Sequence, residues 1–385
     1  MTAGFDGSHA FVRSEDGAFL LEFGGRLHLD YRAYSNEPTA ADPEERATPP
    51  DSFVLRRARF EAAGTLYKDE SNPEKDLYFE FKVQADFADV ESALLRDGYV
   101  NIHVRDEFQV MAGQFKAPFS QEEIQSSKYI PFVERSMLNN LAPSRSPGVM
   151  VFGTLKDSLF QYEVSLQNDR GELGLNSTTG PDLFGRARFK PVPRGPLEKL
   201  FLGGAFGAGN REDETLVIGR TSSRSVVFFN RVPLNGELVR RNLETAWYYR
   251  NIGIESEFLD ASAERLGLGE GGTDLPKLEA RGLLVSALYV LTGEDKSEKG
   301  IAPKRPVQDG GPGAWEVGFR YERFEVDEGT VEGNLAQTYT FGVNWWLNKF
   351  LRYQANLVFE DFRRPPEGFA DASVVAFLTR FGIHF

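Results

Sequence analysis

The chain has no cysteine among its 385 residues, which excludes disulfide bonds, zinc–thiolate sites and thiol nucleophiles. Histidine is also scarce, and its four copies lie far apart, at His9, His28, His103 and His384. None of them has the spacing of a metal-ligand set. The sequence suggests no Ser, His and Asp group either, so we expect no enzyme activity, no metal and no cofactor.

Long apolar runs are missing as well. No stretch approaches the ~20 apolar residues that a membrane-spanning helix needs, and the mean hydropathy is -0.37. Membrane-spanning strands escape this test because only every second residue is apolar. The sequence therefore excludes a helical membrane protein without excluding a membrane β-barrel.

Basic residues are in deficit, since 44 Lys and Arg against 57 Asp and Glu give a net charge of -13. Nucleic-acid binding needs a basic footprint and is not expected. The first residues, Met1 to His9, contain no charged-then-apolar secretion signal. Because such a signal is removed on export, we expect this chain to be the mature form of an exported protein.

Strict alternation of apolar and polar residues is what the sequence does contain. At the carboxy end, Arg380 and His384 alternate with an apolar face made of Val375, Phe377, Phe381, Ile383 and Phe385. Successive residues of a strand point to opposite faces, so this strand is apolar on one side and polar on the other. A strand of this kind with an aromatic carboxy-terminus is typical of bacterial outer-membrane β-barrels.

The same pattern recurs along the chain. It runs through 77–87, longer than the roughly five or six residues of an ordinary strand, and again through 26–32, where Arg26, Asp30 and Arg32 share one face. Burying such charges in a dry sandwich would cost roughly several kcal/mol each. In a wide barrel the apolar face meets lipid and the charged face lines water, so neither face lies in the wrong solvent.

Alternation and turn residues together predict an all-β, transmembrane antiparallel β-barrel of about sixteen strands, a porin-sized single domain over 1–385 with a water-filled channel. The strands are expected at 19–34, 53–67, 76–88, 94–104, 107–116, 148–155, 159–168, 183–190, 200–208, 250–260, 263–268, 279–291, 314–326, 337–347, 350–361 and 372–385. The segment from Leu243 to Tyr249 is either a loop or an added strand, so about eighteen strands is the alternative.

One long connection, residues 117–147, stands out by its composition. It carries Lys128 and Arg135 beside Phe119 and Phe132. Loops longer than ~15 residues are usually functional or disordered, and this one has too many large apolar residues for disorder. We expect it to fold into the lumen as a constriction loop. The alternative is a surface loop that caps the mouth of the barrel.

Several segments carry a family resemblance in the same order along the chain. They include Ser52-Phe-Val-Leu-Arg-Arg-Ala-Arg-Phe60, Gly113-Gln-Phe-Lys-Ala-Pro-Phe-Ser120, Tyr289-Val-Leu-Thr-Gly-Glu294 and Gly342-Val-Asn-Trp-Trp-Leu-Asn348. From about residue 20 to its end, the chain resembles the phosphate-selective porin O and P family. The resemblance implies a homotrimeric, sixteen-stranded porin of the bacterial outer membrane with a loop-built constriction. Small inorganic anions such as phosphate would diffuse through it passively.

The resemblance also implies a ladder of arginines and clusters of lysines along the channel. Arginine suits phosphate because its planar fork donates two parallel hydrogen bonds and stays charged. The expected pore-lining, anion-binding residues are Arg57, Arg59, Lys116, Lys128, Arg135, Arg220, Arg224 and Arg231. Arg57 and Arg59 share the inner face of the second strand, whereas Arg220, Arg224 and Arg231 belong to a Ser-rich connection after the ninth.

Acidic residues share the same inner faces, among them Asp30, Glu61, Asp86, Glu316 and Glu360. Each basic residue is therefore either an ion-binding group or a salt-bridge partner across the wall. Two functions besides the anion channel stay open. One is a general or weakly selective porin, and the other is a barrel with a structural, anchoring role in the cell envelope. In each of them the partner is outer-membrane lipid.

Overall fold

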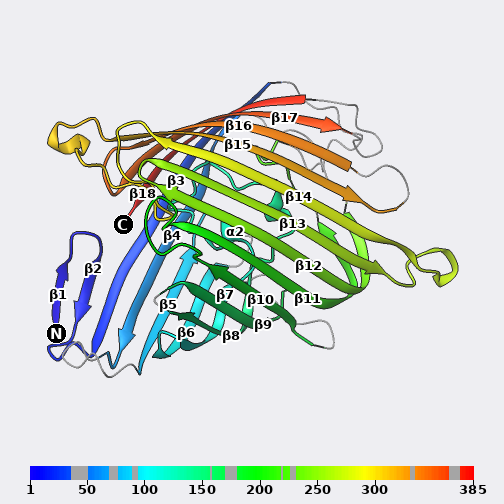
Figure 1. The fold of residues 1–385 in the computed structure, drawn as a ribbon, viewed down its shortest axis with the longest axis horizontal. Helices are drawn as coiled ribbons and strands as arrows, with labels where there is room; N and C mark the ends of the chain where they lie inside the picture. Colours follow the sequence, from blue (N-terminus) through cyan, green and yellow to red (C-terminus); the bar gives the residue numbers. More distant parts are fainter. Residues whose placement is uncertain are drawn as a thin grey trace.

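The barrel is a closed ring of sixteen antiparallel strands, β3 to β18 (Figure 1). The computed structural model describes residues 1–35, 51–68, 77–88, 94–156, 158–169, 180–217, 220–225, 231–329, 334–363 and 373–385. Each strand pairs with the next along the chain, and β18 pairs with β3 to close the ring. Two further strands, β1 and β2, form a hairpin that continues the sheet beside the start of β3.

The strands of the ring range from 8 to 19 residues in length. In chain order the strands are β1 (Thr2–Phe5), β2 (Ala10–Arg13), β3 (Phe19–Ser35), β4 (Ser52–Leu66), β5 (Tyr78–Asp86), β6 (Leu95–Arg105), β7 (Phe108–Lys116), β8 (Arg145–Leu155), β9 (Phe160–Gln167), β10 (Asp182–Phe189), β11 (Leu200–Val217), β12 (Arg231–Tyr249), β13 (Ile252–Arg265), β14 (Leu275–Val290), β15 (Ala314–Asp327), β16 (Asn334–Trp346), β17 (Leu351–Arg363) and β18 (Ser373–His384). The helical turns are α2 (Gln121–Ile124), η1 (Met137–Asn140), η2 (Glu270–Gly272) and η3 (Val307–Asp309). Within the described ranges, none of these helices has the length and apolar character to cross a bilayer.

The strand count agrees with the prediction, but two strand positions do not. β12 runs through residues 231–249, of which only Leu243 to Tyr249 had been considered as a possible added strand. The two strands expected at 250–260 and 263–268 are one continuous strand, β13. Alternation in β12 is obscured by Pro233, Gly236 and the pair Arg240 and Arg241. Leu243 to Tyr249 does belong to a strand, β12, but the barrel has sixteen strands rather than eighteen because 250–260 and 263–268 form one strand.

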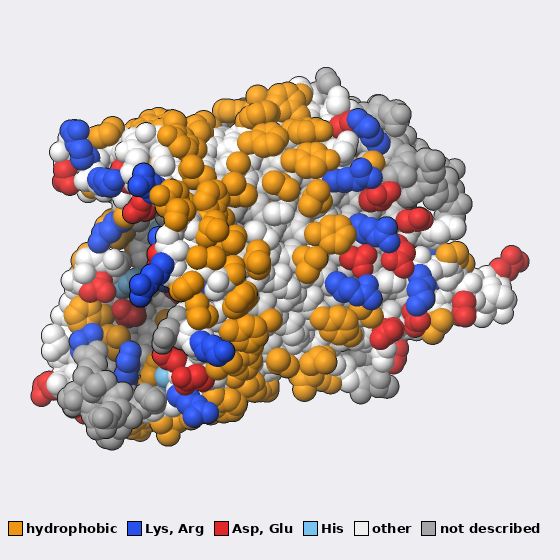
Figure 2. All heavy atoms as spheres, in the orientation of Figure 1, with side chains coloured by type: hydrophobic (Ala, Val, Ile, Leu, Met, Phe, Trp, Pro, Cys, Tyr) orange, Lys and Arg blue, Asp and Glu red, His pale blue; other side chains and the backbone are white. Residues whose placement is uncertain are grey.

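The outer face of the barrel is apolar, as the alternation predicts. Leu243, Phe341 and Phe381 are 65%, 51% and 46% exposed, and Figure 2 shows hydrophobic side chains spread over the strands with charged side chains gathered toward the two ends. Large apolar groups are this exposed over a whole sheet face only where lipid replaces water as the solvent. The outer face is therefore the membrane-contacting surface.

The inner face carries the charged residues, but they are more enclosed than the alternation suggests. Asp30 and Glu316 are fully buried. Asp30 accepts a hydrogen bond of 2.7 Å from Arg380, and Glu316 forms a 2.8 Å ion pair with Lys296. Buried charges persist where partners of opposite sign and hydrogen bonds compensate the loss of water. Much of this inner wall is thus covered by ion pairs and by neighbouring chain segments.

The connection 117–144 contacts the inner face of the barrel at several points. Its backbone carbonyls at Ile130 and Glu134 accept hydrogen bonds of 2.9 Å from Arg352 and Arg320 respectively, and that of Val133 accepts one from Arg380. These arginines belong to β17, β15 and β18. Three guanidinium groups on the strands therefore satisfy backbone groups that a loop inside a barrel would otherwise leave unpaired.

Apolar packing fixes the same connection. Beside this connection the inner face of the barrel is apolar, although the alternation predicts a polar inner face. The buried cluster combines Phe119, Met137, Leu138 and Leu141 of the connection with strand residues Phe184, Val232, Leu234, Leu238, Leu259, Leu278, Leu284, Phe324, Val326, Phe362 and Val374. Each large side chain buried in this way stabilises the structure by about 1.5–3 kcal/mol. The connection is therefore held firmly against this part of the wall.

The carboxylate of Glu123 in α2 helps to hold the start of the connection together. It forms ion pairs with Lys116 (3.6 Å) and Arg135 (3.3 Å). Both cations also donate to backbone carbonyls between 122 and 125. Burial would raise the pKa of Glu123, but Arg135 and Lys116 outweigh it and lower the pKa to about 2.

Placing a charge on the lipid-facing side should destabilise the barrel. We expect Phe341→Lys, in the middle of β16, to lower the free energy of unfolding by about 2–4 kcal/mol, the cost of a lysine near the bilayer midplane. Urea titration of the protein in lipid vesicles measures this. Phe341→Leu is the matched apolar control, and equal stability of the two variants would contradict a membrane-facing Phe341.

Acid should loosen the 117–144 connection. The folded pKa of Glu123 lies below its ordinary 4.5, so its stabilising contribution is complete above about pH 4.5 and is lost as the pH falls toward about 2. Hydrogen exchange of the amides in 121–136, corrected for the intrinsic rate, should show protection falling over that window. Glu123→Gln should have low protection throughout, and an identical pH profile in both proteins would refute the assignment.

Candidate functional site

Five arginines converge on one small cavity inside the barrel. The cavity has a volume of about 60 Å³ and is lined by Arg56, Arg57, Glu134, Arg135, Ser136, Asn139, Asn140, Arg220, Thr221, Ser222 and Arg224. We call Arg56, Arg57, Arg135, Arg220 and Arg224 the arginine cluster. Four of these were predicted from the sequence as anion-binding residues, and the structure brings them together from three separate parts of the chain.

The first part is β4, where a β-bulge aims two consecutive arginines inward. His28 of β3 pairs with Arg57 and Leu29 pairs with Leu55, so Arg56 is the extra residue. A bulge inserts one residue into a strand and re-aims the side chains beside it. Arg56 reaches Glu134 at 2.7 Å, and Arg57 is 3% exposed.

Arg56 was missed by sequence reasoning because strict alternation assigns it to the lipid face. The charge itself was the available signal, since an arginine at a lipid-facing position of a strand is costly. A bulge removes the cost by turning the side chain inward. Two consecutive arginines, Arg56 and Arg57, lie between the apolar residues Leu55 and Ala58. The cost of exposing one of them to lipid is the reason to expect a bulge at this point.

The second part is the short segment 220–225, which is anchored by hydrogen bonds to the inner wall. The amide of Ser223 and the hydroxyl of Ser225 donate to Glu360 of β17 at 2.8 and 2.5 Å. The hydroxyl of Tyr34 in β3 donates to the carbonyl of Ser223 at 3.2 Å. The third part, the 117–144 connection, joins this segment through Asn140, whose amide donates to the carbonyl of Arg220 at 2.8 Å.

Positive charge is in excess around the cavity. Glu134 is the single carboxylate among its lining residues. Burial would raise its pKa, but Arg56 and Arg32 hold the pKa of Glu134 well below its ordinary value, so it stays ionised. Burial lowers the pKa of Arg224 to about 10, which leaves that guanidinium protonated at neutral pH.

Three members of the cluster lack a carboxylate partner within the described part of the chain. Arg57, Arg220 and Arg224 form no ion pair there, whereas Arg56 and Arg135 do. The Nε atom of Arg57 is buried with no hydrogen-bond partner among these residues. A buried cation without a counter-charge is unfavourable, so the site is electrostatically suited to receive an anion.

Three of the remaining predicted residues, Arg59, Lys116 and Lys128, lie outside this cavity and contact carboxylates or backbone carbonyls. Arg59 donates to Asp86 at 2.7 Å, and Lys128 donates to Glu61 at 2.9 Å. Lys116 is bound to Glu123 and the adjacent carbonyls. Arg231 begins β12 rather than lying in a connection, and its side chain lies outside the described residues.

A second basic cavity lies at the end of the barrel that holds both chain termini. It has a volume of about 210 Å³, and its lining includes His9, Lys128, Lys299, Lys349 and His384 but no aspartate or glutamate. Aromatic residues Tyr129, Trp346, Phe350 and Phe385 complete the wall. Lys128 therefore lines this second cavity while it donates a hydrogen bond to Glu61 of the barrel wall.

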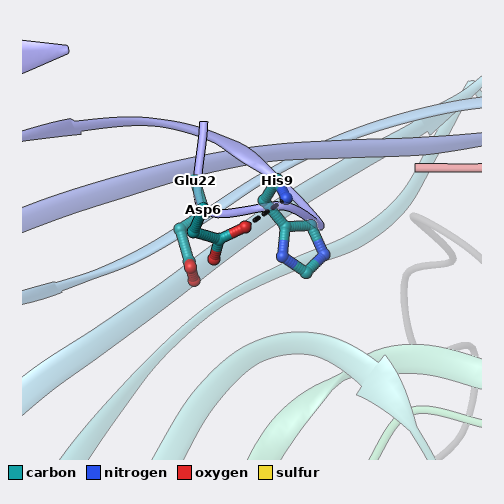
Figure 3. Close-up of side chains that lie close together, drawn as sticks. All are labelled: Asp6, His9 and Glu22. Carbon is teal, nitrogen blue, oxygen red and sulfur yellow. Dashed lines mark hydrogen bonds between the residues drawn. The ribbon is translucent and has the colours of Figure 1, made fainter. Parts of the chain in front are cut away.

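One cluster of potential metal ligands occurs in the described residues, at the β1–β2 hairpin. Ligand atoms of Asp6, His9 and Glu22 lie within 4.8 Å of one another (Figure 3). The Asp6 carboxylate accepts hydrogen bonds from the backbone amides of Ser8 and His9 at 2.6 and 2.7 Å. These bonds are the ordinary stabilisation of an Asx-type turn, so they account for the position of Asp6.

Comparison with known proteins agrees with this architecture. The family model for phosphate-selective porin O and P matches residues 21–216 and 219–364. Porin O of Pseudomonas aeruginosa is 22% identical over 391 residues, covering 90% of this chain and 84% of that protein.

Solved structures of outer-membrane channels share the fold. In-vitro folded OmpT of Vibrio cholerae, in its trimer form, has a TM-score of 0.62 at 11% identity, covering 96% of this chain and all of that one. The outer-membrane channel DcaP of Acinetobacter baumannii gives 0.63 at 10% identity, covering 97% and 99%. The anion-selective porin from Comamonas acidovorans gives 0.60 at 14%, covering 95% and 100%.

The family match covers most of the chain, and the sixteen-stranded barrel with its apolar outer face is the architecture that such a match requires. This protein is therefore an outer-membrane porin, a channel rather than an enzyme, and belongs to the phosphate-selective porin O and P family.

Proposed function

We propose that this porin conducts small inorganic anions, oxyanions such as phosphate among them, and that the arginine cluster is its anion-binding site. The observation that carries the proposal is the charge of the site, five guanidinium groups against the single carboxylate of Glu134. Attraction of one ion sign by a ring of charged side chains is the general basis of selectivity in channels.

The size and chemistry of the cavity suit a small oxyanion. A cavity needs roughly 10–15 Å³ to hold one water molecule, so about 60 Å³ holds a few waters or one small tetrahedral ion. Arginine donates two parallel hydrogen bonds to phosphate oxygens, and hydroxyl groups of Thr221 and Ser222 also line the cavity. Charged and neutral donors therefore surround the space from several sides.

We also propose that residues 117–147 form the constriction of the channel. Contacts with Arg320, Arg352 and Arg380 and burial of Phe119 and Met137 support this role. The segment contributes Arg135 and Glu134 to the cavity, and 220–225 contributes Arg220 and Arg224. Passing anions would meet the cluster where two chain segments narrow the lumen.

Conduction needs sites that an ion can leave as well as enter. The second basic cavity, with Lys128, Lys299 and Lys349 on its wall, would give an anion a further stop near the end that holds the termini. The name of the anion-selective porin from Comamonas acidovorans supports anion passage in this fold. The trimer form of OmpT supports a homotrimer, which we propose for this chain.

Neutralising two unpaired members of the cluster should weaken anion binding. Arg220→Gln with Arg224→Gln removes two charge-assisted interactions, each worth about 1.5–3 kcal/mol, so we expect phosphate block of the chloride current to weaken at least tenfold. Planar-bilayer recordings of the chloride current at rising phosphate concentration measure this. The reversal potential in a salt gradient should also shift toward cations.

The matched control removes the same charge from the outer face. Arg323 and Arg363 are exposed there and pair with Glu325 and Asp361, so Arg323→Gln with Arg363→Gln should leave block and reversal potential unchanged. Cation preference in the unmodified protein would rule out the anion assignment. Equal phosphate block in both double variants would place the binding site elsewhere.

A further inference from the structure

The outer face of the barrel contains an apolar groove of about 750 Å³. It crosses β9 to β13 and is lined by Tyr162, Val164, Gly185, Ala187, Gly204, Phe206, Leu243 and Phe258, with Arg241 and Asp260 among the further lining residues. Pairing places Ala187 opposite Gly204 and Gly185 opposite Phe206, with Phe206 43% exposed on the outer face. We call this feature the outer groove.

Small residues create the depth of the outer groove. Gly185, Ala187 and Gly204 form its floor, and a Cβ added at Gly185 would meet no atom within 4 Å. The rim is high because Leu243 is 65% exposed and Phe258 is 42% exposed. A depression of 300–1,000 Å³ lined by apolar groups is the usual shape of a site for a small, largely apolar ligand.

Two arginines share one carboxylate at the rim of the outer groove. Asp260 of β13 lies in register between Arg241 of β12 and Arg281 of β14. Its carboxylate accepts hydrogen bonds of 2.8 Å from Arg241 and 3.4 Å from Arg281. The arginine side chains are 60% and 64% exposed, whereas that of Asp260 is 17% exposed. This trio therefore presents two accessible guanidinium groups and a net charge of +1 to the surroundings.

The charged row continues around the barrel at the same level. Arg281 pairs in register with Glu325 of β15, and Arg323 lies beside it. Figure 2 shows Lys and Arg side chains alternating with Asp and Glu beyond the apolar band, at the ends of the strands opposite the chain termini. At that end the chain makes long connections, such as 117–144 between β7 and β8, whereas short turns such as 106–107 between β6 and β7 lie at the end that holds the termini. Longer loops of outer-membrane barrels face the cell exterior, so this row lies at the headgroup level of the outer leaflet.

We propose that the outer groove and the arginines at its rim bind lipopolysaccharide, the phosphorylated glycolipid of the outer leaflet. An acyl chain would fill the groove over Gly185 and Gly204, and a phosphate of the headgroup would contact Arg241 and Arg281. Arginine is suited to phosphate by its paired donors, and the apolar floor continues the lipid-facing surface. The site is separate from the arginine cluster and needs only the outer-membrane location.

Charge complementarity favours this occupant over a second copy of the chain. A stable protein interface buries about 800 Å² on each partner, a flat or interlocking area much wider than one groove. Exposed arginines beside a narrow apolar groove match a molecule with both a phosphate and a hydrocarbon chain. A neighbouring protomer seated in the groove is instead one of the outcomes that the test can return.

The test is native mass spectrometry of the full, detergent-solubilised protein with added rough-type lipopolysaccharide. We expect binding to weaken at least tenfold in Arg241→Gln with Arg281→Gln, and also in Gly185→Leu, which fills the groove without changing charge. Dephosphorylated lipid A should bind the unmodified protein at least tenfold more weakly. Arg363→Gln is the matched control, since Arg363 is equally exposed and has its own partner in Asp361.

Two results would overturn the proposal. One is equal lipopolysaccharide binding by the unmodified protein, the two groove variants and the control. The other is occupation of the groove by a second copy, shown by efficient disulfide formation between protomers of Leu243→Cys in membranes. Neither result bears on anion conduction, so failure here and failure of the channel assignment are distinguishable.

Discussion

Guanidinium groups taken out of water must find hydrogen-bond acceptors, and the inside of this barrel is organised around that requirement. Loss of one partner of a buried ion pair costs about 3–5 kcal/mol. On one wall, Arg320, Arg352 and Arg380 find backbone carbonyls of the 117–144 connection. These hydrogen bonds satisfy both partners. The arginines gain acceptors for their buried donors, and the backbone carbonyls of the connection gain donors.

The arginine cluster is the place where acceptors run short. Arg56 and Arg135 have carboxylate partners, but within the described residues Arg57, Arg220 and Arg224 have none. The apolar cluster around Met137 holds the 117–144 connection in place, and the hydrogen bonds to Glu360 hold 220–225. The arginines of these segments therefore stay close to one another. The fold therefore maintains a standing excess of positive charge where a small anion is the missing partner. A net charge of -13 for the whole chain hides this local excess.

Alternation in the sequence was enough to predict the barrel and its outer face, because lipid and a polar interior impose opposite demands on neighbouring residues. The predicted strand count was also right, but the omission of β12 was offset by the division of β13 into two strands. Alternation could not place β12, where Pro233 and Gly236 interrupt the pattern, or recognise the bulge at Arg56. The position of β12 and the bulge at Arg56 both depend on pairing with a neighbouring strand, and the residue pattern within one strand does not show that pairing. The apolar patch on the inner face could not be predicted either, because its side chains are apolar where they pack against the 117–144 connection, and that packing is a tertiary contact.

For the site, the sequence supplied the residue types but not their partners. Arg57, Arg135, Arg220 and Arg224 were all expected to bind anions, and they do line one cavity. Arg59 and Lys128 were expected to do so as well, yet they contact Asp86 and Glu61. Which cation pairs with a wall carboxylate depends on register across several strands. That register cannot be read from the alternation within any one strand.

Anomalous diffraction from crystals soaked in selenate would show whether the arginine cluster binds an oxyanion. We expect a selenium peak in the cavity within hydrogen-bond distance of Arg57, Arg220 or Arg224. A cavity without anomalous signal at a selenate concentration that blocks the chloride current would contradict it. A selenium peak found only at other positions would do the same.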